Sequence, residues 1–106
     1  MTWLYLFVAG IFEIGFALGL KYSEGFTRLW PTLGMVAAGV LSFYLLSTSM
    51  KSLPVGTAYA VWTGIGAAGT AVLGMLFLGE PTNPFRILSV LLVVVGVAGL
   101  RISSSG

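Results

Sequence analysis

The sequence predicts an all-α membrane protein with four transmembrane helices. Three observations support this fold class: 58% of the 106 residues are hydrophobic, only 8% are charged, and four apolar stretches follow one another along the chain. Soluble domains carry about 25% charged residues, so this chain has too few to cover a water-facing surface. The composition therefore excludes a soluble enzyme, a disordered tail and a nucleic-acid-binding domain. With no cysteine and no histidine, no metal and no cofactor are expected.

Short polar or helix-breaking segments separate the four apolar stretches. A spanning helix needs about 20 residues, so four of them fill most of the chain. Pro31 stands where a helix can begin without losing a hydrogen bond. Gly56 follows Pro54, and Pro81 and Pro84 bracket another turn, so both segments interrupt the apolar pattern. Connections this short predict neighbouring helices in one bundle over residues 1–106. The expected spans are about 3–20, 31–50, 57–79 and 85–102.

Basic residues are divided almost evenly between the two sides of the predicted bundle. Lys51 and Arg101 fall on the side of both termini, whereas Lys21, Arg28 and Arg86 fall on the other. Because basic loop residues normally fix orientation, this balance indicates either weak orientation by other factors or insertion in both directions. In the second case an inverted copy would supply the symmetry that many transporters build from inverted repeats.

Glu13 is the only ionisable residue deep within a predicted span. About ten residues of the span precede it and seven follow, which places it near the bilayer centre at about 1.5 Å of rise per residue. Charged groups at that depth are unfavourable and are usually functional. One hypothesis is a protonated carboxyl that only hydrogen-bonds a neighbouring helix. The other is a site for a cation and a proton, which exclude each other at one carboxylate and thereby allow antiport.

Small residues share the helix face of Glu13. Ala9, Gly10 and Ala17 lie three or four positions away, as does Phe16 within one helical turn. The small side chains either let another helix approach closely or leave room for a ligand beside the carboxylate.

The third predicted span carries candidate pocket walls. Tyr59, Trp62, Thr63 and Gly66 are spaced to share one helix face. Aromatic faces attract cations, although an aromatic belt at the membrane interface is the alternative for both rings. Ser42 in the second span is a candidate for orienting Glu13, but a serine also bonds its own helix backbone.

Several glycines lie within the predicted spans. The pattern Gly64-x-Gly66-x-x-Gly69 matches the dinucleotide-binding fingerprint, but no strand precedes it. We interpret it as a flexible or tightly packed point, with Gly64 and Gly66 forming a helix bend. Two further pairs are typical of helix–helix contacts, namely Gly15 with Gly19 and Gly96 with Gly99.

Three features together resemble the small multidrug resistance family over nearly the full length of the chain. They are Glu13 in the first span, residues 21–31 (KYSEGFTRLWP) and residues 54–66 (PVGTAYAVWTGIG). The resemblance implies four-helix subunits in an antiparallel, dual-topology dimer, either a homodimer or a pair of related chains. It also implies export of cations across the bacterial inner membrane in exchange for protons. The implied roles are the family glutamate for Glu13, pocket aromatics for Tyr59 and Trp62, the pocket serine for Ser42, the bend for Gly64 and Gly66, and dimerisation for the fourth span.

The resemblance extends to two branches of the family. Residues 51–59 and 62–67 are similar to the guanidinium-exporting branch, which usually has a tryptophan at the position of Phe16. That tryptophan supports the glutamate through its ring N–H, which phenylalanine lacks. Residues 23–31 are also typical of the branch that exports bulky quaternary ammonium compounds. The resemblance thus implies a proton-coupled exporter of guanidinium and small guanidinyl cations, with a quaternary ammonium or multidrug exporter as the alternative.

Two hypotheses lie outside coupled export. A small structural or regulatory membrane protein has no need of a carboxyl group in mid-membrane, so Glu13 argues against that hypothesis. A cation channel conducts without exchanging protons, so proton-coupled currents distinguish a channel from an exporter.

Overall fold

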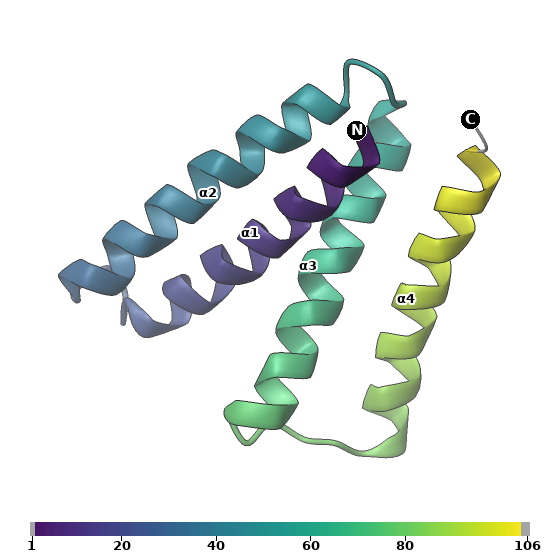
Figure 1. Cartoon of the computed structure of the whole chain (residues 1–106). Helices are drawn as coiled ribbons and strands as arrows, with labels where there is room; N and C mark the ends of the chain where they lie inside the picture. The colour runs from purple at the N-terminus through teal and green to yellow at the C-terminus, as the bar shows by residue number, and fades with distance from the viewer. Residues whose placement is uncertain (1, 105–106) are drawn as a thin grey trace.

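The computed structural model describes residues 2–104, which form four long helices (Figure 1). They are α1 (Thr2–Tyr22), α2 (Leu29–Ser49), α3 (Val55–Phe77) and α4 (Pro84–Ser104). Each is apolar and long enough to cross a membrane, and no strand occurs within residues 2–104. The predicted four-helix, all-α class is therefore confirmed. Residue 1 and residues 105–106, the ends of the predicted domain, lie outside the described residues.

The helix ends lie within one turn of the expected spans. The first residue of α2 is Leu29 rather than Pro31, so Pro31 is the third residue of the helix. Its missing N–H still breaks no hydrogen bond, because the first four N–H groups of a helix have no partner within it. The proline therefore marks the first turn of α2 without being its first residue.

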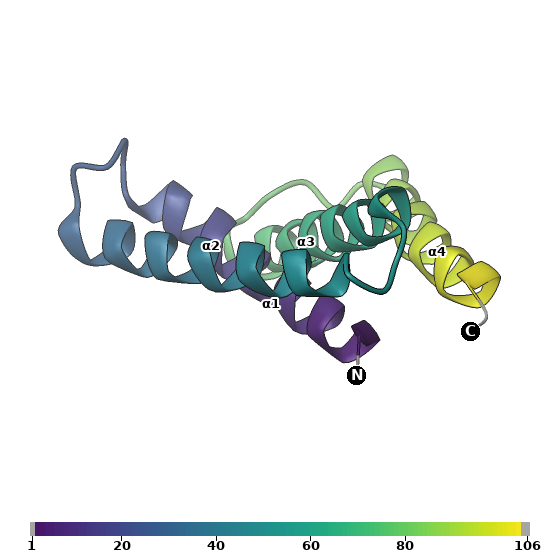
Figure 2. The same cartoon turned by 90° about the horizontal axis from the view of Figure 1, so that it is seen from above.

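The four helices form a flat layer rather than a closed bundle. Their order across the layer is α2, α1, α3, α4, with α1 packed between α2 and α3 and the backbone of α4 packed along α3 (Figures 1 and 2). The Cα atoms extend over 43 × 34 × 17 Å. Consecutive helices are in contact, as the short connections predict, but α2 and α3 diverge from the short loop that joins them, which leaves the layer open.

The buried core lies near the α2–α3 loop, where α1, α2 and α3 converge (Figure 1). It fixes Trp62 of α3, whose exposed fraction is 7%. By contrast, α4 has no buried residue between positions 84 and 103. One end of the layer is therefore packed as in a protein interior, while residues 84–103 of the outer helix are not. The core residues are Leu6, Ala9, Leu46, Ala58, Val61 and Trp62.

The contact between α1 and α2 is close at one of two glycines that the sequence marks as packing positions. A Cβ atom at Gly19 would lie 2.9 Å from the Cβ of Met35 and 3.1 Å from its Cα, too close for either helix backbone to stay in place. A Cβ atom at Gly15 would lie 3.7 Å from the Cβ of Ala38, an ordinary contact. Only Gly19 is therefore needed for the close approach of α2, although the two glycines are one turn apart on the same helix.

This difference predicts different effects of the same substitution. Gly19→Ala forces α1 and α2 apart and should lower the free energy of unfolding by about 1–3 kcal/mol, the usual range for overpacking. Gly15→Ala is the matched control and should be neutral or stabilising by up to about 1 kcal/mol, since alanine favours the helix. Unfolding of the purified protein in detergent measures both. Equal stability of the two variants would show that the α1–α2 distance does not depend on Gly19.

Candidate functional site

Glu13 lies at the middle of α1, half-buried and directly against α3. A Cβ atom at Gly66 would overlap the Glu13 carboxylate, so the side chain fits only because α3 has a glycine there. The Oε2 atom of Glu13 is buried and has no hydrogen-bond partner among residues 2–104. Buried polar atoms are rarely left without a partner, and such an exception calls for a specific explanation. A proton or a bound cation would supply the missing partner.

A small cavity of about 40 Å³ lies on one side of the Glu13 carboxylate. Phe16, Ser42 and Trp62, three residues that the sequence predicts for a pocket, line it together with Glu13. The Phe16 ring covers α2 at Gly39, where a Cβ atom would lie 2.9 Å from the ring Cδ1. The walls of this cavity are therefore largely aromatic, and the only charged group in it is the carboxylate.

Ser42 and Trp62 are fixed by hydrogen bonds to each other and to α1. The Trp62 ring N–H donates to Ser42 Oγ at 2.8 Å, and Ser42 Oγ donates to the carbonyl oxygen of Ala9 at 2.6 Å. Ser42 has one hydroxyl proton, and it donates that proton to Ala9. The ring N–H of Trp62 is likewise committed to Ser42. The expectation that Ser42 orients Glu13 is therefore not met. Instead, this chain of hydrogen bonds ties α1, α2 and α3 together beside the cavity.

Two further rings pack against Trp62. Tyr59 lies 5.4 Å from it between ring centroids, but its exposed fraction is 54% and it lies outside the residues that line the Glu13 cavity. Phe43 also lies 5.4 Å from Trp62 and does line the cavity. Sequence reasoning missed Phe43, although its spacing from Gly39 places both on one face of α2.

A wider groove of about 340 Å³ lies on the other side of Glu13. Thr63 and Gly66 line it, as the shared face predicts, and Thr70 continues the same face of α3 one turn beyond Gly66. The far part of the groove reaches the ion pair of Glu80 with Arg86 in the α3–α4 segment. Sequence reasoning missed both of these residues. Glu13 therefore borders two spaces of different size and chemistry.

The glycines predicted for the pocket and the helix bend lie at close contacts between helices. A Cβ atom at Gly10 would lie 2.5 Å from Ile65 Cγ2, so Gly10 serves close packing of α1 on α3, and the prediction of a pocket wall there is corrected. A Cβ atom at Gly64 would lie 2.5 Å from Val97 Cγ2 of α4. Together with Gly66, these positions bring three helices close to one another. The helix α3 is continuous through this segment, so a bend at Gly64 and Gly66 stays a prediction.

The two glycines of α4 have no such neighbours. Cβ atoms at Gly96 and Gly99 would meet no atom within 4 Å. They lie on an outer helix with no buried residue between positions 84 and 103. Within the described chain they are therefore not packing positions, and they leave open surface for a contact.

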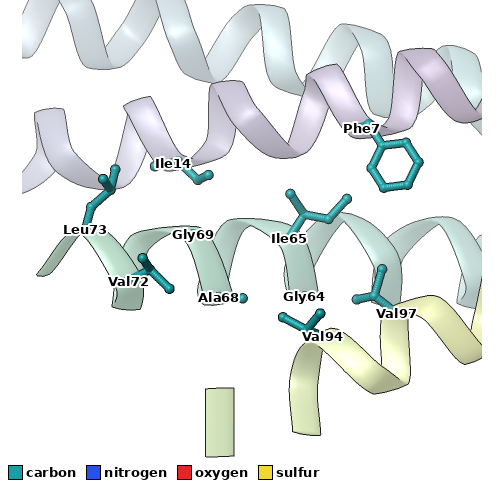
Figure 3. A pocket seen from close by; sticks show the side chains of 10 residues that line it. All are labelled: Phe7, Ile14, Gly64, Ile65, Ala68, Gly69, Val72, Leu73, Val94 and Val97. Atoms are coloured by element: carbon teal, nitrogen blue, oxygen red, sulfur yellow. The ribbon is translucent and has the colours of Figure 1, made fainter. Parts of the chain in front are cut away.

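A larger hollow of about 560 Å³ lies between α1, α3 and α4, and Figure 3 shows the side chains that line it. Its lining is apolar throughout, with Phe7, Ile14, Ile65 and Val94 from the three helices. It has no charged or hydrogen-bonding side chain, so it offers a cation neither a counter-charge nor a hydrogen-bond partner. Size alone therefore does not identify the site, and the unpartnered carboxylate does.

Comparison with known proteins agrees with these features. The family described as "Small Multidrug Resistance protein" matches residues 1–93. Proteins named "Guanidinium exporter" from Citrobacter freundii and Escherichia coli (strain K12) are each 53% identical over 98% of this chain and 99% of their own length. The relative of the same name from Proteus vulgaris is 52% identical over 98% of this chain and all of its own. These names describe transporters rather than enzymes. With four membrane-length helices and these matches, the chain is a multi-pass protein of the bacterial inner membrane and belongs to the small multidrug resistance family.

Proposed function

We propose that this chain is a proton-coupled antiporter that exports guanidinium and small guanidinyl cations. The observation that carries the proposal is the buried Glu13 oxygen with no partner, set between an aromatic cavity and a groove. The guanidinium exporters that share about half of its residues support the choice of substrate.

The proposed mechanism depends on competition at one carboxylate. A proton neutralises Glu13, and a cation can bind only after that proton leaves. The faces of Phe16, Phe43 and Trp62 add attraction for a cation without offering it a second negative charge. Because one site holds either a proton or a cation, moving it between the two sides of the membrane exchanges one for the other.

The size of the aromatic cavity favours a small cation. At about 40 Å³ it is the smaller of the two spaces that border Glu13, so the aromatic side of the carboxylate suits a small cation better than a bulky one. The alternative substrate class, quaternary ammonium compounds, finds support in Phe16, which has no N–H to hold Glu13 in one rotamer. Comparing both classes of cation in one transport assay distinguishes the two functions.

We also propose that two copies of the chain pair in opposite orientations. A flat layer leaves α4 without a buried residue between positions 84 and 103, and open space beside Gly96 and Gly99 allows a second helix to approach closely. The balanced basic residues favour neither orientation. An antiparallel homodimer, or a pair with a related chain, would cover α4 and surround Glu13 with a second layer. A bend of α3 at Gly64 and Gly66 would then let the dimer alternate between inward-open and outward-open conformations.

The first functional prediction concerns Glu13→Gln. Glutamine has the size of glutamate but cannot release a proton, so proton-driven guanidinium transport in proteoliposomes should be lost. Folding, judged by elution and thermal unfolding in detergent, should be kept. Glu24→Gln, an exposed carboxylate in the α1–α2 loop, is the matched control and should transport like the native protein.

The same carboxylate sets the pH dependence in the native protein. Guanidinium binding should weaken as pH falls, because protons compete for Glu13. Full transport by Glu13→Gln, or binding that is independent of pH, would contradict the mechanism. Native transport of quaternary ammonium with none of guanidinium would instead support the alternative substrate class.

The second functional prediction concerns orientation. Tags at the C-terminus of the native chain should be accessible from both faces of the membrane. Ser52→Lys with Ser103→Lys adds charge on the side of the termini, and Thr27→Lys with Thr82→Lys adds it on the other, so each pair should fix an opposite orientation. Each double variant alone should lose transport, and co-expression should restore it. If every native copy has the same orientation, an antiparallel homodimer is ruled out.

A further inference from the structure

The ion pair between Glu80 and Arg86 lies at the end of the groove that begins at Glu13. Both side chains line the groove, and both are partly exposed, Glu80 to 40% and Arg86 to 32%. Glu80 follows the end of α3, and Arg86 lies in the first turn of α4. Both are at the end of the layer where the α3–α4 segment runs (Figure 1). A cation that enters the groove from this end meets the pair before it reaches Glu13.

The backbone around the pair holds Glu80 over the groove. Gly79 has a φ of +69°, a left-handed conformation that turns the chain back at the end of α3. The Glu80 N–H then donates to the carbonyl oxygen of Gly74 at 3.2 Å, and a Cβ atom at Gly74 would overlap the Glu80 carboxylate. On the opposite side, the Asn83 side chain accepts from the Arg86 N–H at 2.9 Å and caps α4. The two charged residues are therefore held by separate helix ends.

The pair itself is only partly satisfied. One guanidinium nitrogen, Nη2 of Arg86, contacts one carboxylate oxygen, Oε1 of Glu80, while the Arg86 Nε is buried and has no hydrogen-bond partner in the described part of the chain. A guanidinium and a carboxylate are strongest when two parallel hydrogen bonds form, and this pair does not reach that arrangement. Partly exposed ion pairs with one contact contribute little to stability. The pair can therefore open at small cost in free energy.

We propose that Glu80 is an outer binding site for guanidinium-type cations, which Arg86 occupies when no substrate is present. The inference rests on the proposed function, because the substrate and the Arg86 side chain carry the same planar group. A free guanidinium ion can form two parallel hydrogen bonds to Glu80 without a side chain limiting its approach. The cation displaces Arg86, binds Glu80 at the groove entrance and passes along Thr70 and Thr63 to Glu13.

Opposite effects of two substitutions test this proposal. Glu80→Gln removes the outer charge and should raise the half-saturating guanidinium concentration for transport in proteoliposomes, by about threefold or more for one partly exposed charge pair. Arg86→Gln removes the competing guanidinium and should lower that concentration, by about twofold or more. Equilibrium binding to Glu13 and its pH dependence should stay native in both variants. The matched control, Glu24→Gln, changes the charge of the other loop on the same side and should leave the half-saturating concentration unchanged.

A purely structural ion pair predicts a different pattern. Both substitutions would then break the same contact and move the half-saturating concentration in the same direction, or not at all, and either result overturns the proposal. If Glu80→Gln does not fold, Arg86→Gln tests the proposal by itself. A lower half-saturating guanidinium concentration supports the outer site, and a raised or unchanged one contradicts it. Absence of guanidinium transport by the native protein would instead refute the proposed function itself.

Discussion

The contact between the Glu13 carboxylate and the backbone of α3 is the constraint on which the site depends. It exists only because position 66 is a glycine, and it leaves one carboxylate oxygen buried without a partner. The remaining features of the site hold the helices in place around that contact. The bonds from Trp62 to Ser42 and from Ser42 to Ala9 join α1, α2 and α3, and Gly10 lets α3 pack against α1.

The shape of the chain limits what one copy can do. A layer with Cα extents of 43 × 34 × 17 Å gives Glu13 walls on the sides of α2 and α3, but it does not surround the carboxylate as a closed bundle would. The outer helix α4 contributes no buried residue between positions 84 and 103. A second copy would supply the missing cover, so the proposed antiport at Glu13 depends on the proposed dimer.

The sequence predicts the parts of the fold and site that follow from composition and helical periodicity. Apolar length and the breakers around Pro54 and Pro84 suffice for four helices, and one acidic residue in an apolar span suffices to single out Glu13. Spacing alone brings Phe16 to the cavity and Thr63 to the groove.

Features that depend on contacts between helices could not be predicted in this way. Which acceptor the Ser42 hydroxyl finds depends on how α1 and α2 pack, and the exposure of Tyr59 depends on how closely the neighbouring helices approach α3. The approach of Glu80 to the groove depends on a left-handed Gly79 between two helices. Residue type does not fix these distances, so helical periodicity could not predict the Glu80–Arg86 pair.

Competition between a proton and a cation at Glu13 is measured most directly as proton release on cation binding. Guanidinium added to the native protein in weakly buffered detergent should release protons, followed with a pH indicator, because a cation can bind Glu13 only after its proton leaves. The release should shrink as the starting pH rises, since fewer carboxyl groups then carry a proton. Glu13→Gln should release none. Guanidinium binding to the native protein without proton release, or equal release from Glu13→Gln, would contradict competition at Glu13.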